Sequence, residues 1–254
     1  MTPLVLELLN GFEQHISSGL LLLRYEENRR WSELGFSSSS YPHGFTGLHG
    51  AAFLGLGEIV AALLAKKKWN INATDAMGGT ALLWAAIRGH EDTVGILLRQ
   101  KDANADIRDI RFGKTPLLWA AELGHQPVVQ LLLGREDINP NTADTEYGRT
   151  PLGWAASRGN AGVVKLLLER KDINPNAADT EYGRTPLGWA ARDRHERTLE
   201  LLLERKDINP DIADTEYGRT PLGWAAWRGN AGAVKLLLER KEIGRASCRE
   251  RVCT

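Results

Sequence analysis

The segment Phe112–Thr115, "FGKT", contains the residue types with which proteins bind nucleotide phosphates. It ends like a phosphate-binding loop, in which backbone amides and a lysine surround the phosphate groups. The full motif needs another glycine five residues before the one in "FGKT", and that position holds Arg108. The related segment "YGRT" recurs further along the chain. We therefore interpret Phe112–Thr115 as a loop tip joined to the start of a helix, and we predict no nucleotide site.

Histidine and cysteine, which are common metal ligands, are spaced too widely for a metal site. The histidines are His15, His43, His49, His90, His125 and His195. The last three recur at multiples of 35 residues, so stacked units would hold neighbouring ones about 10 Å apart, far beyond ligand distances of about 2 Å from one metal ion. We expect these three to form loop hydrogen bonds. Both cysteines, Cys248 and Cys253, lie at the end of the chain, which excludes a disulfide framework in its body.

The composition narrows the function further. The 254 residues carry 32 basic and 32 acidic side chains, so no net charge attracts nucleic acid or an anionic membrane. The longest aliphatic run is Leu20–Leu23, far short of a membrane helix, and the start carries Glu7 without a positive region, unlike a signal peptide. No nucleophile lies beside a base, and no carboxylates cluster. We expect an intracellular, cytoplasmic protein that is not an enzyme, with no cofactor, no metal, no nucleic acid and no membrane among its partners.

A period of 34 to 35 residues organises most of the chain. Its marker is a threonine that recurs at Thr46, Thr80, Thr115, Thr150, Thr185 and Thr220. A tryptophan keeps the same step at Trp84, Trp119, Trp154, Trp189 and Trp224. The segment "DTEYGRTPLGWAA" is repeated without change from Asp144, Asp179 and Asp214. Near-identity of this kind predicts stacked units, because each unit must fit both of its neighbours.

Each unit reads as two short helices and a loop. Thr150 is a good N-cap residue, and Pro151 follows at the first helical position, where its missing N–H costs nothing. A glycine ends the first helix, at Gly89, Gly124, Gly159 and Gly229. "NAGVVKLLLERK" predicts the second helix from its apolar stripe. "DINPNAADTEYG" contains turn residues and predicts an extended loop or hairpin.

These residues resemble the ankyrin repeat, as in "TPLGWAASRGNAGVVKLLLERKDINPN". The resemblance covers Phe45 to Glu242 and implies an all-α solenoid that binds another protein through its hairpin tips and concave helix face. The predicted units are 45–77, 78–111, 112–146, 147–181, 182–216 and a truncated 217–242. The family's T-P-L-H histidine, which ties loops together, remains only as His49. The turn glycine of the fifth unit is replaced by Arg194, which makes that unit the predicted weak point.

The tryptophans allow two interpretations. Trp154 lies about 200° around the helix from Leu152, away from the core face. It could pack against the neighbouring tryptophan, or it could line the concave groove as a binding anchor. We favour packing, and leave partner contact open.

Loop tips and one variable row supply the candidate partner-binding residues. The tips combine an aromatic residue with opposite charges, at Arg111, Phe112, Glu146, Tyr147, Arg149, Glu181, Tyr182, Arg184, Glu216, Tyr217 and Arg219. The row after "WAA" varies between units and adds Arg158, Arg192, Trp227 and Arg228. The alternatives are a solvated tip with a Glu–Arg pair three residues apart, and drift on a tolerant surface.

The two ends of the chain depart from the repeat. Residues 1–44 predict a helical cap, because Leu4, Leu8, Phe12 and Ile16 form an apolar helical stripe. The alternative is the remnant of an upstream domain, because "LLNGFEQHISSGLLLLRYEENRRW" followed by "PHGFTGLHGAAF" resembles the junction before the repeats of fungal NACHT-type NOD-like proteins. The alternative functions are therefore the sensing arm of such a regulator, or a structural spacer. The tail 243–254, with "IGRASCRERV", resembles a translated sequencing adapter and predicts a non-native end. We then expect an uncovered stripe (Val234, Leu236, Leu237 and Leu238) that allows self-association.

Overall fold

The computed structural model describes residues 44–66 and 69–240. The predicted N-terminal cap, His15, His43 and the tail 243–254 lie outside the described residues. The chain divides into two compact units on either side of the boundary between Arg111 and Phe112. Throughout the described residues the elements are helices connected by turns and bends.

The described part of the first unit contains two helix pairs. The helices are α4 (Gly47–Phe53), α5 (Gly57–Ala65), α6 (Ala81–Arg88) and α7 (Glu91–Leu98). Helix α4 packs against α6, and α5 packs against α7. Leu48, Val60 and Leu97 are almost completely buried between them.

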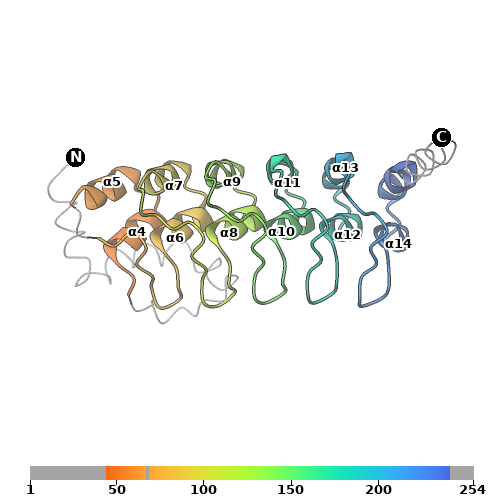
Figure 1. The fold of residues 1–254 in the computed structure, drawn as a ribbon, viewed down its shortest axis with the longest axis horizontal. Coiled ribbons are helices and arrows are strands. Elements are labelled where there is room, and N and C mark those ends of the chain that lie inside the picture. Colours follow the sequence, from red (N-terminus) through yellow and green to blue (C-terminus); the bar gives the residue numbers. More distant parts are fainter. Residues whose placement is uncertain (1–43, 67–68, 241–254) are drawn as a thin grey trace. The chain divides into compact units, whose positions relative to one another are not determined.

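The second unit continues the same plan over four repeats (Figure 1). Its helices are α8 (Pro116–Leu123), α9 (Gln126–Leu133), α10 (Pro151–Arg158), α11 (Ala161–Glu169), α12 (Pro186–Arg192), α13 (Glu196–Glu204) and α14 (Pro221–Trp227), and residues 231–240 are also helical. The helices α8, α10, α12 and α14 lie side by side in one layer, and α9, α11 and α13 lie in a second. Long loops project from the first layer on the side away from the second.

The predicted start and stop signals shape the first helix of each repeat. At α10, the Thr150 hydroxyl accepts a hydrogen bond from the Gly153 amide at 3.2 Å, and Pro151 takes the first helical position. Thr115, Thr185 and Thr220 cap their helices in the same way. Gly159 then ends the helix with a left-handed φ of 73°. A residue with a side chain is strained in that region, which explains the glycine.

Hydrogen bonds across repeat boundaries tie the loops together. His195 lies 3.0 Å from the Ser157 carbonyl and His90 lies 2.9 Å from that of Phe53, which are the predicted loop contacts. In the fourth repeat Asn160 takes the place of the histidine, and its side-chain amide donates to the carbonyls of Ala121 and Glu122 in the previous repeat. The loops themselves are joined by Asn141, which donates to the Asp172 carbonyl at 2.7 Å and accepts from the next loop.

Arg194 adopts the left-handed conformation that its position imposes, with a φ of 65°. It is the one residue other than glycine with a positive φ in the described part of the chain. Its guanidinium donates a hydrogen bond to the Arg228 carbonyl in the next repeat. That bond partly offsets the backbone strain, and no pattern within the fifth repeat predicts it.

We expect Arg194→Gly to raise the free energy of unfolding by about 1 kcal/mol, because glycine adopts the left-handed region without strain. Chemical denaturation of the two proteins measures the difference. Arg194→Ala is the control: it keeps the strain and loses the hydrogen bond, so it should be the least stable of the three. A glycine variant that is less stable than the parent would contradict the strain argument.

Candidate partner-binding groove

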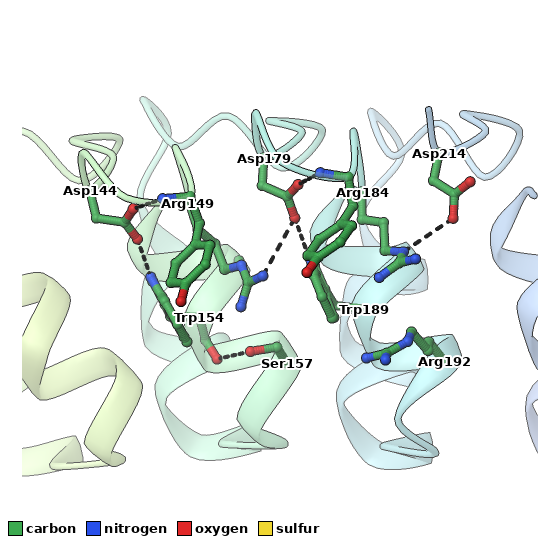
Figure 2. Close-up of polar contacts among 12 residues, drawn as sticks. Asp144, Arg149, Trp154, Ser157, Asp179, Arg184, Trp189, Arg192 and Asp214 are labelled. Carbon is green, nitrogen blue, oxygen red and sulfur yellow. Dashed lines mark hydrogen bonds and ion pairs between the residues drawn. The ribbon is translucent and has the colours of Figure 1, made fainter. Parts of the chain in front are cut away.

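A buried aspartate fixes each tryptophan of the later repeats to the loop before it. The indole N–H of Trp154 donates to Asp144 at 2.5 Å, and the same carboxylate accepts the Tyr147 amide at 2.6 Å. Asp179 accepts from the Trp189 indole in the same way (Figure 2), and Asp214 accepts from the Trp224 indole. This bond takes over the loop-fixing role of the missing histidine, which at its remaining position, His49, contacts the Ala73 carbonyl at 3.0 Å.

Cationic side chains lie between successive tryptophans. The Arg149 guanidinium carbon is 4.3 Å from the ring centre of Trp154 and 4.0 Å from that of Trp189. Arg184 lies in the same way between Trp189 and Trp224, at 4.9 and 4.5 Å. Attraction between a cation and an aromatic ring strengthens as water is excluded. We call this alternation the cation–aromatic ladder, and its members are Trp119, Lys114, Trp154, Arg149, Trp189, Arg184, Trp224, Arg219 and Trp227.

The ladder corrects the prediction that Arg149 and Arg184 are exposed at the loop tips. Arg149 is 7% exposed and Arg184 is 4% exposed. Arg184 pairs with two carboxylates of the following repeat, Asp214 at 3.1 Å and Glu216 at 2.6 Å. Their ion pairs therefore run between repeats and take the place of the alternative pair within one tip. We favoured packing of each tryptophan against its neighbour. In the structure the tryptophans of successive repeats pack against the cations between them, and within the sixth repeat Trp224 packs edge-on against Trp227, with ring centres 5.4 Å apart.

Burial and ion pairing have opposing effects on the pKa of Arg149 and on that of Asp214, and both pKa values are lowered. Burial lowers the pKa of Arg149, against the attraction of Asp179 and Asp144. Burial alone would raise the pKa of Asp214. The amides of Tyr217 and Arg219, the Trp224 indole and the Arg184 guanidinium stabilise its charged form and bring that pKa below the usual value. Both ions therefore remain charged near neutral pH.

The lysine of "FGKT" is engaged within the protein. Lys114 is buried and its ammonium lies 2.5 Å from the Glu122 carboxylate, which also pairs with Arg158 at 2.7 Å. Glu122 belongs to the variable row that we predicted to be surface, yet only 9% of it is exposed. Its burial follows from this pairing with two cations. The geometry supports our interpretation of the segment as a loop tip joined to a helix start.

The tip tyrosines pack edge-on against the tryptophans. The ring centres of Tyr147 and Trp154 are 5.8 Å apart, and those of Tyr217 and Trp224 are 5.7 Å apart. Each tyrosine hydroxyl also bonds to the glutamate before it, which raises the pKa of Tyr147, Tyr182 and Tyr217. Tyr217 remains 57% exposed, so its ring is accessible to a partner.

An open groove of about 540 Å³ runs along this surface from the fourth to the sixth repeat. Its aromatic lining consists of Tyr147, Trp154, Tyr182, Trp189, Tyr217, Trp224 and Trp227. Its charged lining consists of Arg149, Glu181, Arg184, Arg192, Glu216, Arg219 and Arg228. The structure thus brings together most of the candidate residues from these three repeats.

Four candidates lie outside the lining of this groove. Phe112 packs edge-on against Trp119, with ring centres 5.7 Å apart, and Arg111 is an exposed residue at the end of the first unit. Arg158 pairs with Glu122, and Glu146 bonds to Tyr147. Sequence reasoning missed the three aspartates, although each lies ten residues before its tryptophan. That constant spacing was the available signal.

The model for "Ankyrin repeats (3 copies)" matches residues 13–109, 48–144, 103–179 and 173–247. The chain belongs to the ankyrin-repeat family. Two solved structures share its fold. The ankyrin-repeat protein EF0377 is 24% identical with a TM-score of 0.69, over 78% of this chain and 98% of its own. An ankyrin repeat domain from Acinetobacter baumannii is 28% identical with a TM-score of 0.68, over 76% and 97%. No curated protein matches the chain.

The family membership confirms the predicted all-α ankyrin fold. Ankyrin-repeat proteins are generally interaction modules and not enzymes. Over residues 44–66 and 69–240, no cluster of histidine, cysteine, aspartate and glutamate could hold a metal ion. Within the same part, every helix is too short or too polar to cross a membrane. The cytoplasmic location and the unit boundaries stay predictions.

Proposed function

We propose that this ankyrin array binds another protein through the groove of repeats four to six. The observation that carries the proposal is the exposed aromatic pair Tyr217 and Trp227, each 57% exposed, in the sixth-repeat part of the groove. Aromatic and arginine side chains dominate the binding energy of protein interfaces. The ladder holds these side chains in place before a partner arrives, which reduces the entropy lost on binding.

Two substitutions remove the aromatic pair. The rings of Tyr217 and Trp227 lie against Trp224, at 5.7 and 5.4 Å between ring centres, but both are largely exposed, so removing them leaves the buried side chains of the ladder in place. Trp227→Ser installs the residue that the fourth repeat carries at this position, Ser157, whose hydroxyl bonds to the Trp154 carbonyl. Tyr217→Ala removes an exposed ring. Ile110→Ala is the matched control, because that side chain is 74% exposed and lies in the first unit. All three proteins should keep the circular dichroism spectrum and melting temperature of the parent.

Peptides of about twelve residues, long enough to span three repeats of about 10 Å each, form the test library. We expect display selection on the parent chain to enrich peptides whose synthetic copies bind at least about tenfold more weakly to Trp227→Ser/Tyr217→Ala. The same copies should bind the Ile110→Ala control like the parent. Selected peptides that bind the groove variant and the parent equally well would refute the groove. A spacer would enrich none.

The sensing arm of a NACHT-type regulator remains a prediction from the resemblance of residues 1–44, nearly all of which lie outside the described residues. Self-association also stays a prediction. In the predicted uncovered stripe of the sixth repeat, Leu237 is buried within the repeat, whereas Leu238 is 46% exposed.

A further inference from the structure

The variable row changes character along the second unit. Equivalent positions hold Glu122 in the third repeat, Ser157 in the fourth, Arg192 in the fifth and Trp227 in the sixth. In the third repeat, Glu122 neutralises Lys114 and Arg158. In the fifth, the same position adds a cation. This position therefore changes from acidic in the third repeat to basic in the fifth, although the whole chain carries no net charge.

Four arginines of the fifth and sixth repeats lie at or beside the groove, and we call them the arginine cluster. They are Arg192, Arg194, Arg219 and Arg228. Three of them line a second depression of about 600 Å³ together with Asp193 and Trp227. The fourth, Arg219, lies 4.8 Å from the Trp227 ring centre, and Arg228 lies 4.9 Å from it.

Few carboxylates compensate this cluster. Asp193 pairs with Arg192 at 3.0 Å. The groove glutamate Glu216 and the buried Asp214 are both engaged by Arg184. Arg228 forms no ion pair within the described part of the chain, so its guanidinium group is available to an external anion. Guanidinium groups bind carboxylates with strong, oriented hydrogen bonds.

We infer that the partner segment in this groove is acidic, and that its carboxylates bind the arginine cluster at the fifth and sixth repeats. This inference rests on the proposed function, and it adds both the chemistry of the partner and its placement along the groove. The aromatic rings then contact the less charged remainder of the segment.

A single-stranded nucleic acid fits this surface less well, although its phosphates are also anionic. Such ligands stack their bases on open aromatic faces. The ring of Trp189 has Arg149 on one side and Arg184 on the other, and Trp154 lies between Lys114 and Arg149. Glu181 and Glu216 also line the groove, where they would repel a continuous phosphate backbone. A short peptide whose carboxylates lie at the arginine cluster needs no open aromatic face and places no continuous negative charge along Glu181 and Glu216.

The test uses residues that other repeats already carry at the same positions. Arg192→Ser copies Ser157, and Arg228→Asp copies Asp193. The control pair Lys165→Asp/Arg197→Ser makes the same total change in charge on α11 and α13, where both side chains are exposed. Equal melting temperatures of the two double variants and the parent confirm that all three are folded.

Each protein is then titrated with peptides from the display selection, with a synthetic octaglutamate and with a single-stranded DNA oligonucleotide. We expect the selected peptides to be rich in aspartate and glutamate. Their affinity and that of octaglutamate should fall at least about tenfold for Arg192→Ser/Arg228→Asp, and less than about twofold for the control pair. Raising the salt concentration should weaken the binding of these peptides to the parent protein.

The outcomes separate the inference from the proposed function. Groove-dependent peptides that are neutral or basic would overturn the acidic partner and leave groove binding intact. Equal losses in the two double variants would show a general charge effect and also overturn the inference. An oligonucleotide that binds more tightly than the peptides would replace the acidic segment with nucleic acid. Peptides indifferent to Trp227→Ser/Tyr217→Ala would overturn groove binding and the inference with it.

Discussion

Trp154→Ala should lower the free energy of unfolding by about 3–5 kcal/mol, the usual cost of truncating a large buried aromatic side chain. Only 7% of Trp154 is exposed, and its ring separates Lys114 from Arg149. The substitution also leaves the buried Asp144 without its indole donor. Urea denaturation followed by circular dichroism measures the loss. Trp154→Phe keeps an aromatic face and removes the indole N–H, so it should lower the free energy of unfolding clearly less than Trp154→Ala does.

Binding measurements on the same variant distinguish a packing role from a contact role. At temperatures where Trp154→Ala remains folded, it should bind selected peptides with an affinity close to that of the parent. Trp227→Ser should show the reverse pattern, with stability kept and binding lost, because its ring is 57% exposed. An unchanged stability together with lost binding in Trp154→Ala would contradict the packing role.

Asp179→Ala should also lower the free energy of unfolding by about 3–5 kcal/mol, because it removes one partner of a buried ion pair and leaves the other charged. The Asp179 side chain is fully buried, and it accepts the Tyr182 amide at 2.7 Å and the Trp189 indole at 2.6 Å. It also faces the Arg149 guanidinium at 3.7 Å. The variant leaves two donors unsatisfied and one buried cation without its counter-ion.

Asp172→Ala is the matched control for this experiment. Asp172 pairs with Arg170 at 2.8 Å, closer than Asp179 lies to Arg149, but 54% of its side chain is exposed. Exposed ion pairs contribute little because water screens them, so this variant should unfold at the same urea concentration as the parent. Similar losses in the two aspartate variants would show that burial does not decide the effect.

The sequence was sufficient to predict the local structure, and the family resemblance supplied the fold. Thr150 and Pro151 start a helix, and Gly159 ends it with a left-handed turn, each for reasons contained within a few residues. The role of Arg149 could not be predicted in this way. Its neighbours Tyr147 and Trp154 are close to it in the sequence, but the ring on its other side belongs to Trp189, forty residues later. Charge at a loop tip normally indicates exposure, and only the stacked geometry shows that the guanidinium is enclosed.

The inward position of Glu122 was hidden for the same reason. The variable row reads as surface, because its members differ so widely in size and charge. Whether a member is buried depends on the cations that the same and the following repeat place around it, here Lys114 and Arg158. A pattern within one repeat contains no information on that pairing.

The cation–aromatic ladder has a direction. The fourth and fifth repeats each offer a guanidinium, Arg149 or Arg184, to a carboxylate and an indole of the following repeat. Two unlike faces that join head to tail form a heterologous contact, which can be repeated along an open array unless its rotation closes a ring. Removing or inserting one whole 35-residue unit therefore creates a junction with the same pair of faces. The number of repeats can change without any redesign of the joints, whereas a partial unit would leave a buried arginine facing no carboxylate.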